Sequence, residues 1–318
     1  MVQRILEPGE IETLAQRSIP RVRLPDRDTV FALRAARLHS LARENAIGGY
    51  LQFLAAIAQA QHRAVAALEV ALPDAACIAQ AATYRMPPVP ATGWQRDPRW
   101  IDALHDLARD VAAAAAMPEA VSAICARIRS TPREAIERMA DALLVGDAID
   151  FASAPLVMAA LQVHWVALTK AFKAETVAAL DVPGVCPLCG TLPVASIVRA
   201  QSSYQGYRYL HCALCATEWH MVRVHCSSCG ADGKPVAYHA LQAADAADAS
   251  MAVQDAAVRA EACETCHSYR KILYQEKDIA VDAVADDVAT LALDVLLGTQ
   301  GFHRASGNPM LWQATQDG

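Results

Sequence analysis

Residues 186–229 read CPLCGTLPVASIVRAQSSYQGYRYLHCALCATEWHMVRVHCSSC, and residues 263–266 add CETC. Together the two stretches contain four Cys-x-x-Cys pairs, separated by 22, 10 and 33 intervening residues. Two residues between the cysteines let one tight turn aim both thiolates at one ion, and two such turns complete a tetrahedron. The spacing therefore predicts two mononuclear sites. The eight candidate metal ligands are Cys186, Cys189, Cys212, Cys215, Cys226, Cys229, Cys263 and Cys266.

The order in which the four pairs combine stays open at this point. Pairing in chain order places the first two pairs on one ion and the last two on the other, and an interleaved pairing is the alternative. Gly190 and Gly230 each follow a second cysteine, where a positive φ lets the backbone turn beneath the sulfurs. Such turns are typical of rubredoxin-type or zinc-ribbon sites.

Other kinds of cysteine chemistry fit the pattern less well. Four disulfides need an oxidising compartment, whereas the N-terminal residues lack the apolar stretch of a secretory signal. A thioredoxin-like motif is a single pair after a strand of a βαβ unit, and ferredoxin clusters use cysteines in a close run. We therefore expect mononuclear sites in a cytoplasmic protein.

Four thiolates suit iron and zinc alike, so the ligands alone leave the metal open. A complete set of protein ligands leaves no free coordination position, which argues against Lewis-acid catalysis. The sites would then be structural or carry single electrons. In zinc-finger peptides such ions supply roughly 10 to 16 kcal/mol of apparent folding free energy, so we expect this region to depend on its metal.

Residues 10–182 have the pattern of an all-helical domain. Apolar residues recur near the helical period, for example at Ile47, Leu51, Leu54, Ala58 and Val65. Prolines interrupt the pattern at 20–25 and 84–98. Residues 151–169 carry no formal charge, but polar residues and a proline interrupt them and alanine is only weakly hydrophobic. We interpret them as a buried helix rather than an integral membrane segment.

After Val182-Pro183-Gly184 alanine becomes rarer and cysteine, tyrosine and histidine appear. The predicted fold is a mainly α N-terminal domain (1–183), a small β-rich region with two rubredoxin-like or zinc-ribbon four-cysteine sites (184–277), and a C-terminal helix with a tail (278–318). We predict strands at 194–201, 207–212 and 218–224, with a hairpin turn at 202–206. Residues 241–262 could form a helix or a loose loop.

The predicted C-terminal helix covers residues 278–298. Its apolar stripe consists of Val281, Val284, Val288, Leu291 and Val295. Two cysteines outside the pairs, Cys77 and Cys125, lie in alanine-rich helical stretches, and we expect them to be small buried residues rather than nucleophiles.

Histidines and aromatic residues accompany the cysteine pairs. We expect His211, His225 and His267 to lie around the sites or at the surface rather than to bind metal, because eight thiolates already complete two tetrahedra. The aromatic residues expected to cover the metal cores are Tyr204, Tyr207, Tyr209 and Trp219.

Further motifs run along nearly the whole chain. They include Arg37-Leu38, Tyr50-Leu51-Gln52-Phe53, Ala60-Gln61, Tyr207 to Cys212, Cys215 to Trp219, Tyr274 to Asp278, Ala285-Asp286-Asp287, Asp294, Gly301-Phe302 and Asn308-Pro309. Together with four Cys-x-x-Cys pairs in this order, these motifs resemble the FdhE family, the formate dehydrogenase formation (accessory) proteins.

The resemblance implies a cytoplasmic, non-catalytic maturation factor, not an enzyme. It would bind the catalytic subunit of a respiratory formate dehydrogenase before assembly and export. It also implies rubredoxin-like iron at the eight cysteines, one ion per four-cysteine site, with zinc as the alternative.

Two other functions compete with this interpretation. The first is a rubredoxin-like electron-transfer protein whose iron acts on a partner's cofactor. The second is a zinc-ribbon nucleic-acid binder, which the charge disfavours: the chain carries −6, and residues 184–275 hold seven Lys/Arg against seven Asp/Glu. We expect no nucleic-acid partner, and self-association stays open.

Overall fold

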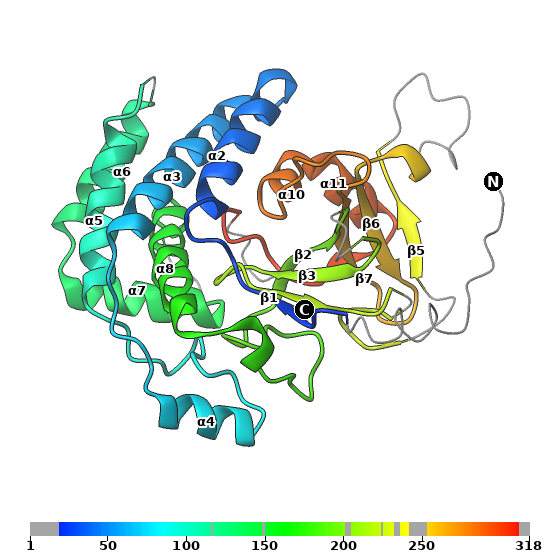
Figure 1. The fold of residues 1–318 in the computed structure, drawn as a ribbon. Helices are drawn as coiled ribbons and strands as arrows, with labels where there is room; N and C mark the ends of the chain where they lie inside the picture. The colour runs from blue at the N-terminus through cyan, green and yellow to red at the C-terminus, as the bar shows by residue number, and fades with distance from the viewer. Residues whose placement is uncertain are drawn as a thin grey trace.

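The computed structural model describes residues 19–115, 117–147, 150–200, 205–223, 225–231, 236–241 and 253–311. A layer of helices lies beside one twisted sheet, and the last helices of the chain pack against that sheet (Figure 1). The predicted fold class, helical first and β-rich with two four-cysteine clusters afterwards, is confirmed.

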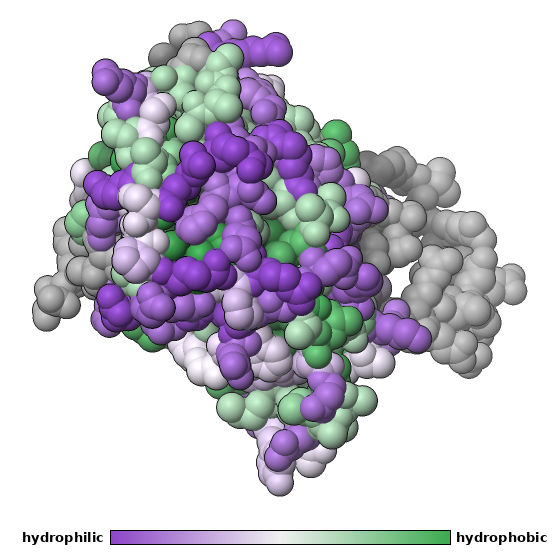
Figure 2. All heavy atoms as spheres, turned by 90° about the vertical axis from the view of Figure 1, so that its left-hand side faces the viewer, coloured by the Kyte–Doolittle hydropathy of each residue, from purple (hydrophilic) through white to green (hydrophobic). Residues whose placement is uncertain are grey.

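The helices of the N-terminal part follow one another along the chain, with the longest connection, residues 84–98, between α4 and α5. They are α2 (Val30–Leu41), α3 (Gly48–Ala67), α4 (Ala75–Thr83), α5 (Arg99–Ala112), α6 (Glu119–Ser130), α7 (Arg133–Val145) and α8 (Ala154–Leu168), with 3-10 turns at Ala42–Glu44, Thr169–Ala171 and Ala174–Thr176. The outer face of this layer is mostly hydrophilic (Figure 2), and ion pairs such as Arg133–Asp102 cross between its helices. A hydrophilic face of this kind is typical of a solvent-exposed surface.

Helix α8 forms the centre of the helical layer. Every residue of α8 except Met158 is buried, because α3, α5 and α7 surround it. Helices that are hydrophobic all round belong in a core, so the interpretation of residues 151–169 as a buried helix is confirmed. Within the described residues, no helix has the length and apolar character needed to cross a bilayer.

The described strands form one sheet with the order β1-β4-β3-β2-β7-β6-β5, and β8 also pairs with β7. They are β1 (Val22–Arg23), β2 (Pro193–Val198), β3 (Arg208–Cys212), β4 (Glu218–His220), β5 (Val236–His239), β6 (Val258–Cys263), β7 (Ser268–Tyr274) and β8 (His303–Arg304). The predicted hairpin is β2–β3, which is antiparallel from Val198↔Arg208 to Pro193↔Cys212. The three predicted strands are therefore confirmed, although the last is shorter than expected.

The sheet contains the same unit twice. Strands β2, β3 and β4 form one antiparallel trio, and β5, β6 and β7 form another. In each trio the second strand ends on a cysteine, Cys212 in β3 and Cys263 in β6. The trios join through the parallel pair β2–β7. Residues 258–262 belong to β6, so neither a helix nor a loop describes that part of 241–262, and residues 242–252 lie outside the described residues.

One hydrophobic core runs through both layers. It includes Leu54 and Trp165 from the helices, Cys189 and Leu210 from the metal-binding region, and Val284 near the C-terminus. The division of the chain at residue 183 stays a prediction, since the core continues across it.

The C-terminal segment corrects one prediction. Residues 278–298 do not form a single helix: α10 (Ala285–Ala289) and α11 (Leu291–Thr299) meet at Thr290, whose backbone is not helical. The buried Lys271 ammonium donates to the carbonyls of Asp287, at 2.6 Å, and Thr290, at 3.1 Å. These contacts lie at the break between the two helices, where Thr290 O also accepts from Leu293 N at 3.0 Å. As a result Val295 is exposed, and Leu293 and Leu297 are buried instead.

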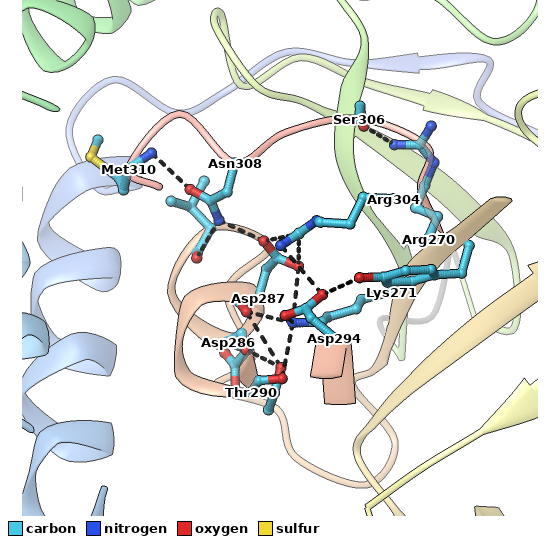
Figure 3. Close-up of polar contacts among 12 residues, drawn as sticks. Arg270, Lys271, Asp286, Asp287, Thr290, Asp294, Arg304, Ser306, Asn308 and Met310 are labelled. Atoms are coloured by element: carbon cyan, nitrogen blue, oxygen red, sulfur yellow. Dashed lines mark hydrogen bonds and ion pairs between the residues drawn. The ribbon is translucent and has the colours of Figure 1, made fainter. Parts of the chain in front are cut away.

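A network of buried charges holds these two helices on the sheet (Figure 3). Lys271 of β7 contacts the carboxylates of Asp287, at 3.3 Å, and Asp294, at 2.7 Å. Arg304 of β8 contacts the same two carboxylates, and Asn308 donates to Asp287. Two cations and two anions balance, so the charges within this network are paired.

We predict that Lys271→Met destabilises the protein by about 3 kcal/mol or more, because it leaves carboxylates buried without their ammonium partner. Lys277→Met is the matched control, since Lys277 pairs with the exposed Asp255 and should change stability by less than about 1 kcal/mol. Urea unfolding of the metal-loaded protein measures both. Equal effects of the two substitutions would contradict this role of Lys271.

Candidate metal centres

The eight cysteines gather in two groups of four, in chain order. The first cluster is Cys186, Cys189, Cys212 and Cys215, and the second cluster is Cys226, Cys229, Cys263 and Cys266. Within each cluster the sulfurs all lie within 4.8 Å of one another. The structure therefore pairs the turns sequentially, and the interleaved alternative is wrong.

The sulfur separations fit one tetrahedral ion per cluster. In the first cluster Cys186 Sγ lies 3.5 Å from Cys215 Sγ, and Cys189 Sγ lies 3.4 Å from Cys212 Sγ. In the second cluster two such distances are 3.8 Å. Metal–sulfur bonds of about 2.3 Å in a tetrahedron require sulfurs about 3.8 Å apart. The donor set suits zinc or iron.

Each pair lies in a turn of the same construction, which we call a knuckle: residues 186–191, 212–217, 226–231 and 263–268. In the first three knuckles the N–H of the first cysteine donates to the carbonyl five residues on, at 2.8–2.9 Å. The residue after the second cysteine has a positive φ in all four. These residues are Gly190 at 76°, Ala216 at 55°, Gly230 at 75° and His267 at 53°.

Only two of these four positions carry the glycine that signals such a turn. Ala216 and His267 adopt the left-handed conformation at a cost of about 1–2 kcal/mol each, which the surrounding hydrogen bonds must offset. A hydroxyl two residues after the second cysteine contacts the sulfur at 3.1 Å in three knuckles, through Thr191, Thr217 and Ser268. This Cys-x-Thr/Ser pattern was present in the sequence but was not among the predicted features.

The helical layer seals the first cluster. All four of its cysteines are buried. The proline-rich segment after α4 pairs with the first knuckle, where Val89 N donates to Leu188 O and Ala91 N to Cys189 O. Gln162 of α8 donates to Ala213 O in the second knuckle at 2.7 Å. The helices thus contribute directly to the first cluster.

The second cluster lies at the surface. Cys229 is exposed and Cys266 is half-buried. Two buried arginines support its inner side: Arg270 Nε donates to Ser227 Oγ at 2.9 Å, and Arg208 Nη1 donates to His225 O at 3.0 Å. Burial lowers the pKa of Arg270 to about 10, which leaves it charged at neutral pH. Four thiolates around a divalent ion carry a net charge of −2, which these cations favour.

The ionisation of the cluster thiols is linked to metal binding. Burial raises the pKa of the Cys186 and Cys215 thiols well above their ordinary value and that of Cys226 to about 12. Burial would raise the pKa of Cys212 as well, but hydrogen bonds from the neighbouring thiols lower it. Four thiolates cannot stay ionised side by side without a positive ion, so a metal must displace protons to bind here.

The predictions for the histidines and for the two cysteines outside the pairs can be compared with the structure. The two clusters contain no histidine: His211 bonds Glu218 at 3.1 Å, and the ring of His267 lies 6.1 Å from that of Phe302. Cys125 is buried as predicted, but Cys77 is exposed, because no residue of α4 is buried. The expectation of a buried Cys77 is wrong.

The aromatic residues near the clusters anchor backbone carbonyls. Tyr209 donates to Pro20 O and Trp219 to Pro183 O, both at 2.8 Å. Tyr207 packs edge-on against His220, and Tyr204 lies outside the described residues. That these rings cover the metal cores stays a prediction.

Comparison with known proteins shows the family to which the chain belongs. Family models match residues 19–181 as FdhE, N-terminal, residues 185–223 as the FdhE central domain and residues 224–311 as the FdhE C-terminal domain. The chain belongs to the FdhE family. The model boundaries near 181–185 and 223–224 fall before the first knuckle and between the two clusters.

Relatives match the chain from end to end. It is 36% identical over 315 residues to Protein FdhE of Salmonella choleraesuis (strain SC-B67), covering 97% of each chain. It is 36% identical over 309 residues to the FdhE homolog of Klebsiella pneumoniae (strain ATCC 700721 / MGH 78578), covering 96% of each. The crystal structure of the FdhE protein from Pseudomonas aeruginosa superposes with a TM-score of 0.77 at 33% identity, covering 92% of this chain and 99% of that one.

The difference in exposure between the clusters predicts two rates of metal loss. With excess chelator, the second cluster should release its ion at least about tenfold faster than the first, since a chelator reaches an exposed thiolate directly. Stopped-flow absorbance of a chromogenic chelator measures the release. Cys229→Ser should accelerate only the fast phase, and Cys189→Ser only the slow one. A single phase, or the reverse assignment, would contradict the role given to burial.

Proposed function

We propose that this chain is a non-catalytic formation factor in the cytoplasm, which binds the catalytic subunit of a respiratory formate dehydrogenase before that enzyme is assembled. The observation that carries the proposal is membership of the FdhE family over nearly the full length, combined with two complete four-cysteine clusters. Sites with four protein ligands leave no position for a substrate. The metal sites would then stabilise the fold, and the surface of that fold would bind the partner subunit.

We also propose that each cluster holds one ion through its four thiolates. Iron is favoured by the family resemblance, and zinc fits the same donors. The ion would supply the charge that allows four thiolates to stay ionised. The chain's own residues orient it through the knuckle hydrogen bonds, and the helical layer excludes water from the first cluster.

Co-expression of the tagged chain with a formate dehydrogenase catalytic subunit tests the proposal. We expect the tagged chain to capture the subunit in a complex. Cys186→Ser with Cys189→Ser should abolish capture, because the first cluster joins the helices to the sheet. Cys77→Ser is the matched control, since it alters an exposed cysteine outside both clusters, and it should leave capture unchanged. Failure of the unaltered chain to capture the subunit would refute the proposal.

A second function, electron transfer through iron, is favoured by one observation. The exposed Cys229 brings an edge of the second cluster to the surface, where electrons could pass to a partner. Anaerobically purified protein should then be red and bleach reversibly with a reductant. A colourless protein with about two zinc ions per chain would remove this alternative.

A further inference from the structure

A small cavity of about 10 Å³ lies on the inner side of the second cluster. Among the described residues that line it, the charged side chains are Arg208, Glu261 and Arg270. The ligands Cys226 and Cys263 line the same cavity. Two cations and one carboxylate therefore lie beside the thiolates, which leaves one positive charge that no carboxylate of this lining balances.

The single carboxylate of the cavity pairs with Arg208. Arg208 Nη2 lies 2.6 Å from Glu261 Oε2, and both side chains are buried. Arg270 is only 4% exposed. Within the described residues its guanidinium donates to neutral acceptors, which are Ser227 Oγ at 2.9 Å, Ser306 Oγ at 2.5 Å (Figure 3) and Pro193 O. A buried guanidinium without a carboxylate partner is unfavourable unless another anion lies close.

The second cluster supplies such an anion. Ser227 lies between the ligands Cys226 and Cys229, so the hydrogen bond from Arg270 reaches the knuckle itself. Burial lowers the pKa of Arg270 to about 10, and both Glu261 and an ionised Cys226 oppose that shift. The guanidinium and the thiolate are therefore close enough to interact. Four thiolates around a divalent ion carry a net charge of −2, so a loaded second cluster is the anion that Arg270 lacks.

The knuckle that Arg270 contacts differs from the other three at one position. In those three, the hydroxyl two residues after the second cysteine contacts a sulfur, through Thr191, Thr217 and Ser268. The corresponding residue of the knuckle 226–231 is Ala231. Hydrogen bonds to a ligand sulfur stabilise its ionised form and tune the metal. The charge of Arg270 thus lies beside the one knuckle that has no hydroxyl at this position.

We propose that Arg270 is the counter-charge of the second metal site, which raises the affinity of that site for a divalent cation and, when the ion is iron, favours the ferrous state over the ferric one. Four thiolates give a net charge of −2 with ferrous iron and −1 with ferric iron. A fixed cation nearby therefore raises the reduction potential. Arg270 acts on the ion through its charge and is a positioning residue. The proposal rests on the proposed binding of one ion at each cluster.

Variants of the full-length, metal-loaded chain separate the charge of Arg270 from its hydrogen bonds. Arg270→Lys keeps the positive charge, whereas Arg270→Gln keeps an amide donor and removes the charge. Glu261→Gln makes the opposite change, because it removes the negative charge from the same cavity. Arg96→Gln is the control for loss of a buried arginine, since the Arg96 side chain is 8% exposed and pairs with Glu137 and Asp141 in the helical layer.

Competition with a chromogenic chelator for Zn²⁺ measures the affinity of each site, and Cys229→Ser identifies the second one. We expect Arg270→Gln to lower the Zn²⁺ affinity of the second site by about 10–100-fold, the range typical of residues that support metal ligands, and to leave the first site unchanged. Arg270→Lys should lose clearly less. Glu261→Gln should bind Zn²⁺ more tightly at the second site than the unaltered chain does, and Arg96→Gln should bind it equally well.

The iron-loaded chain gives a measurement that a purely structural role of Arg270 would not change. A tenfold weaker preference for ferrous over ferric iron lowers a one-electron midpoint potential by about 59 mV. We expect Arg270→Gln to lower the midpoint potential of the second site by at least this amount, and Arg270→Lys to stay close to the unaltered chain. Anaerobic spectroelectrochemistry measures these potentials.

Equal losses of Zn²⁺ affinity in Arg270→Lys and Arg270→Gln would overturn the proposal, because they would assign Arg270 a structural role through its hydrogen bonds. An unchanged second site in Arg270→Gln would overturn it as well. Should neither Arg270 variant fold, Glu261→Gln decides, and a second site that binds Zn²⁺ no more tightly than before refutes the counter-charge. If the unaltered chain binds no Zn²⁺ at the second cluster, the proposed metal binding itself fails and this proposal falls with it.

Discussion

Two groups of four thiolates, each closed around one point, constrain the rest of this structure. The four knuckles fix where the chain turns between residues 186 and 268, and the described strands between them hold three to six residues each. Each cluster therefore organises the same sequence of parts: a knuckle, two antiparallel strands, a second knuckle and a third strand. The parallel pair β2–β7 joins the two units into one sheet. Both clusters are therefore integral parts of the fold.

The two clusters differ in solvent exposure because different parts of the chain pack on them. The first lies under the helical layer, where the segment at 84–98 and Gln162 of α8 bond its knuckles. The second faces solvent through Cys229 and is supported from within by Arg208 and Arg270. A sealed cluster is suited to joining helices and sheet. The exposed one is suited to exchange with the surroundings, whether of ions or of electrons.

Sequence reasoning was strongest where local spacing decides the structure. The Cys-x-x-Cys spacing predicted both clusters, and the proline breaks and helical periodicity predicted the helical layer. Sequence reasoning was weaker where the local structure depends on a residue from a distant part of the chain. The break between α10 and α11 contacts Lys271, which lies 16 residues before Asp287 and belongs to another element. The apolar stripe from Val281 to Val295 gives no sign that Lys271 contacts the backbone there.

Other misses have similar causes. The repeat of the strand trio was missed although β6 alternates, with Val258, Ala260 and Ala262 between Arg259 and Glu261. The left-handed residues Ala216 and His267 carry no glycine signal, since their conformation is imposed by the knuckle. Cys77 was expected to be buried because alanine-rich helices usually pack, whereas α4 stands clear of the helical layer.

X-ray absorption at the metal edge, together with the metal content of anaerobically purified protein, tests the central claim most directly. Two ions per chain, each surrounded by four sulfurs at about 2.3 Å, are the predicted result for iron or zinc. A chain that is folded with its thiols free and no bound metal, or an ion with nitrogen or oxygen among its ligands, would contradict the account.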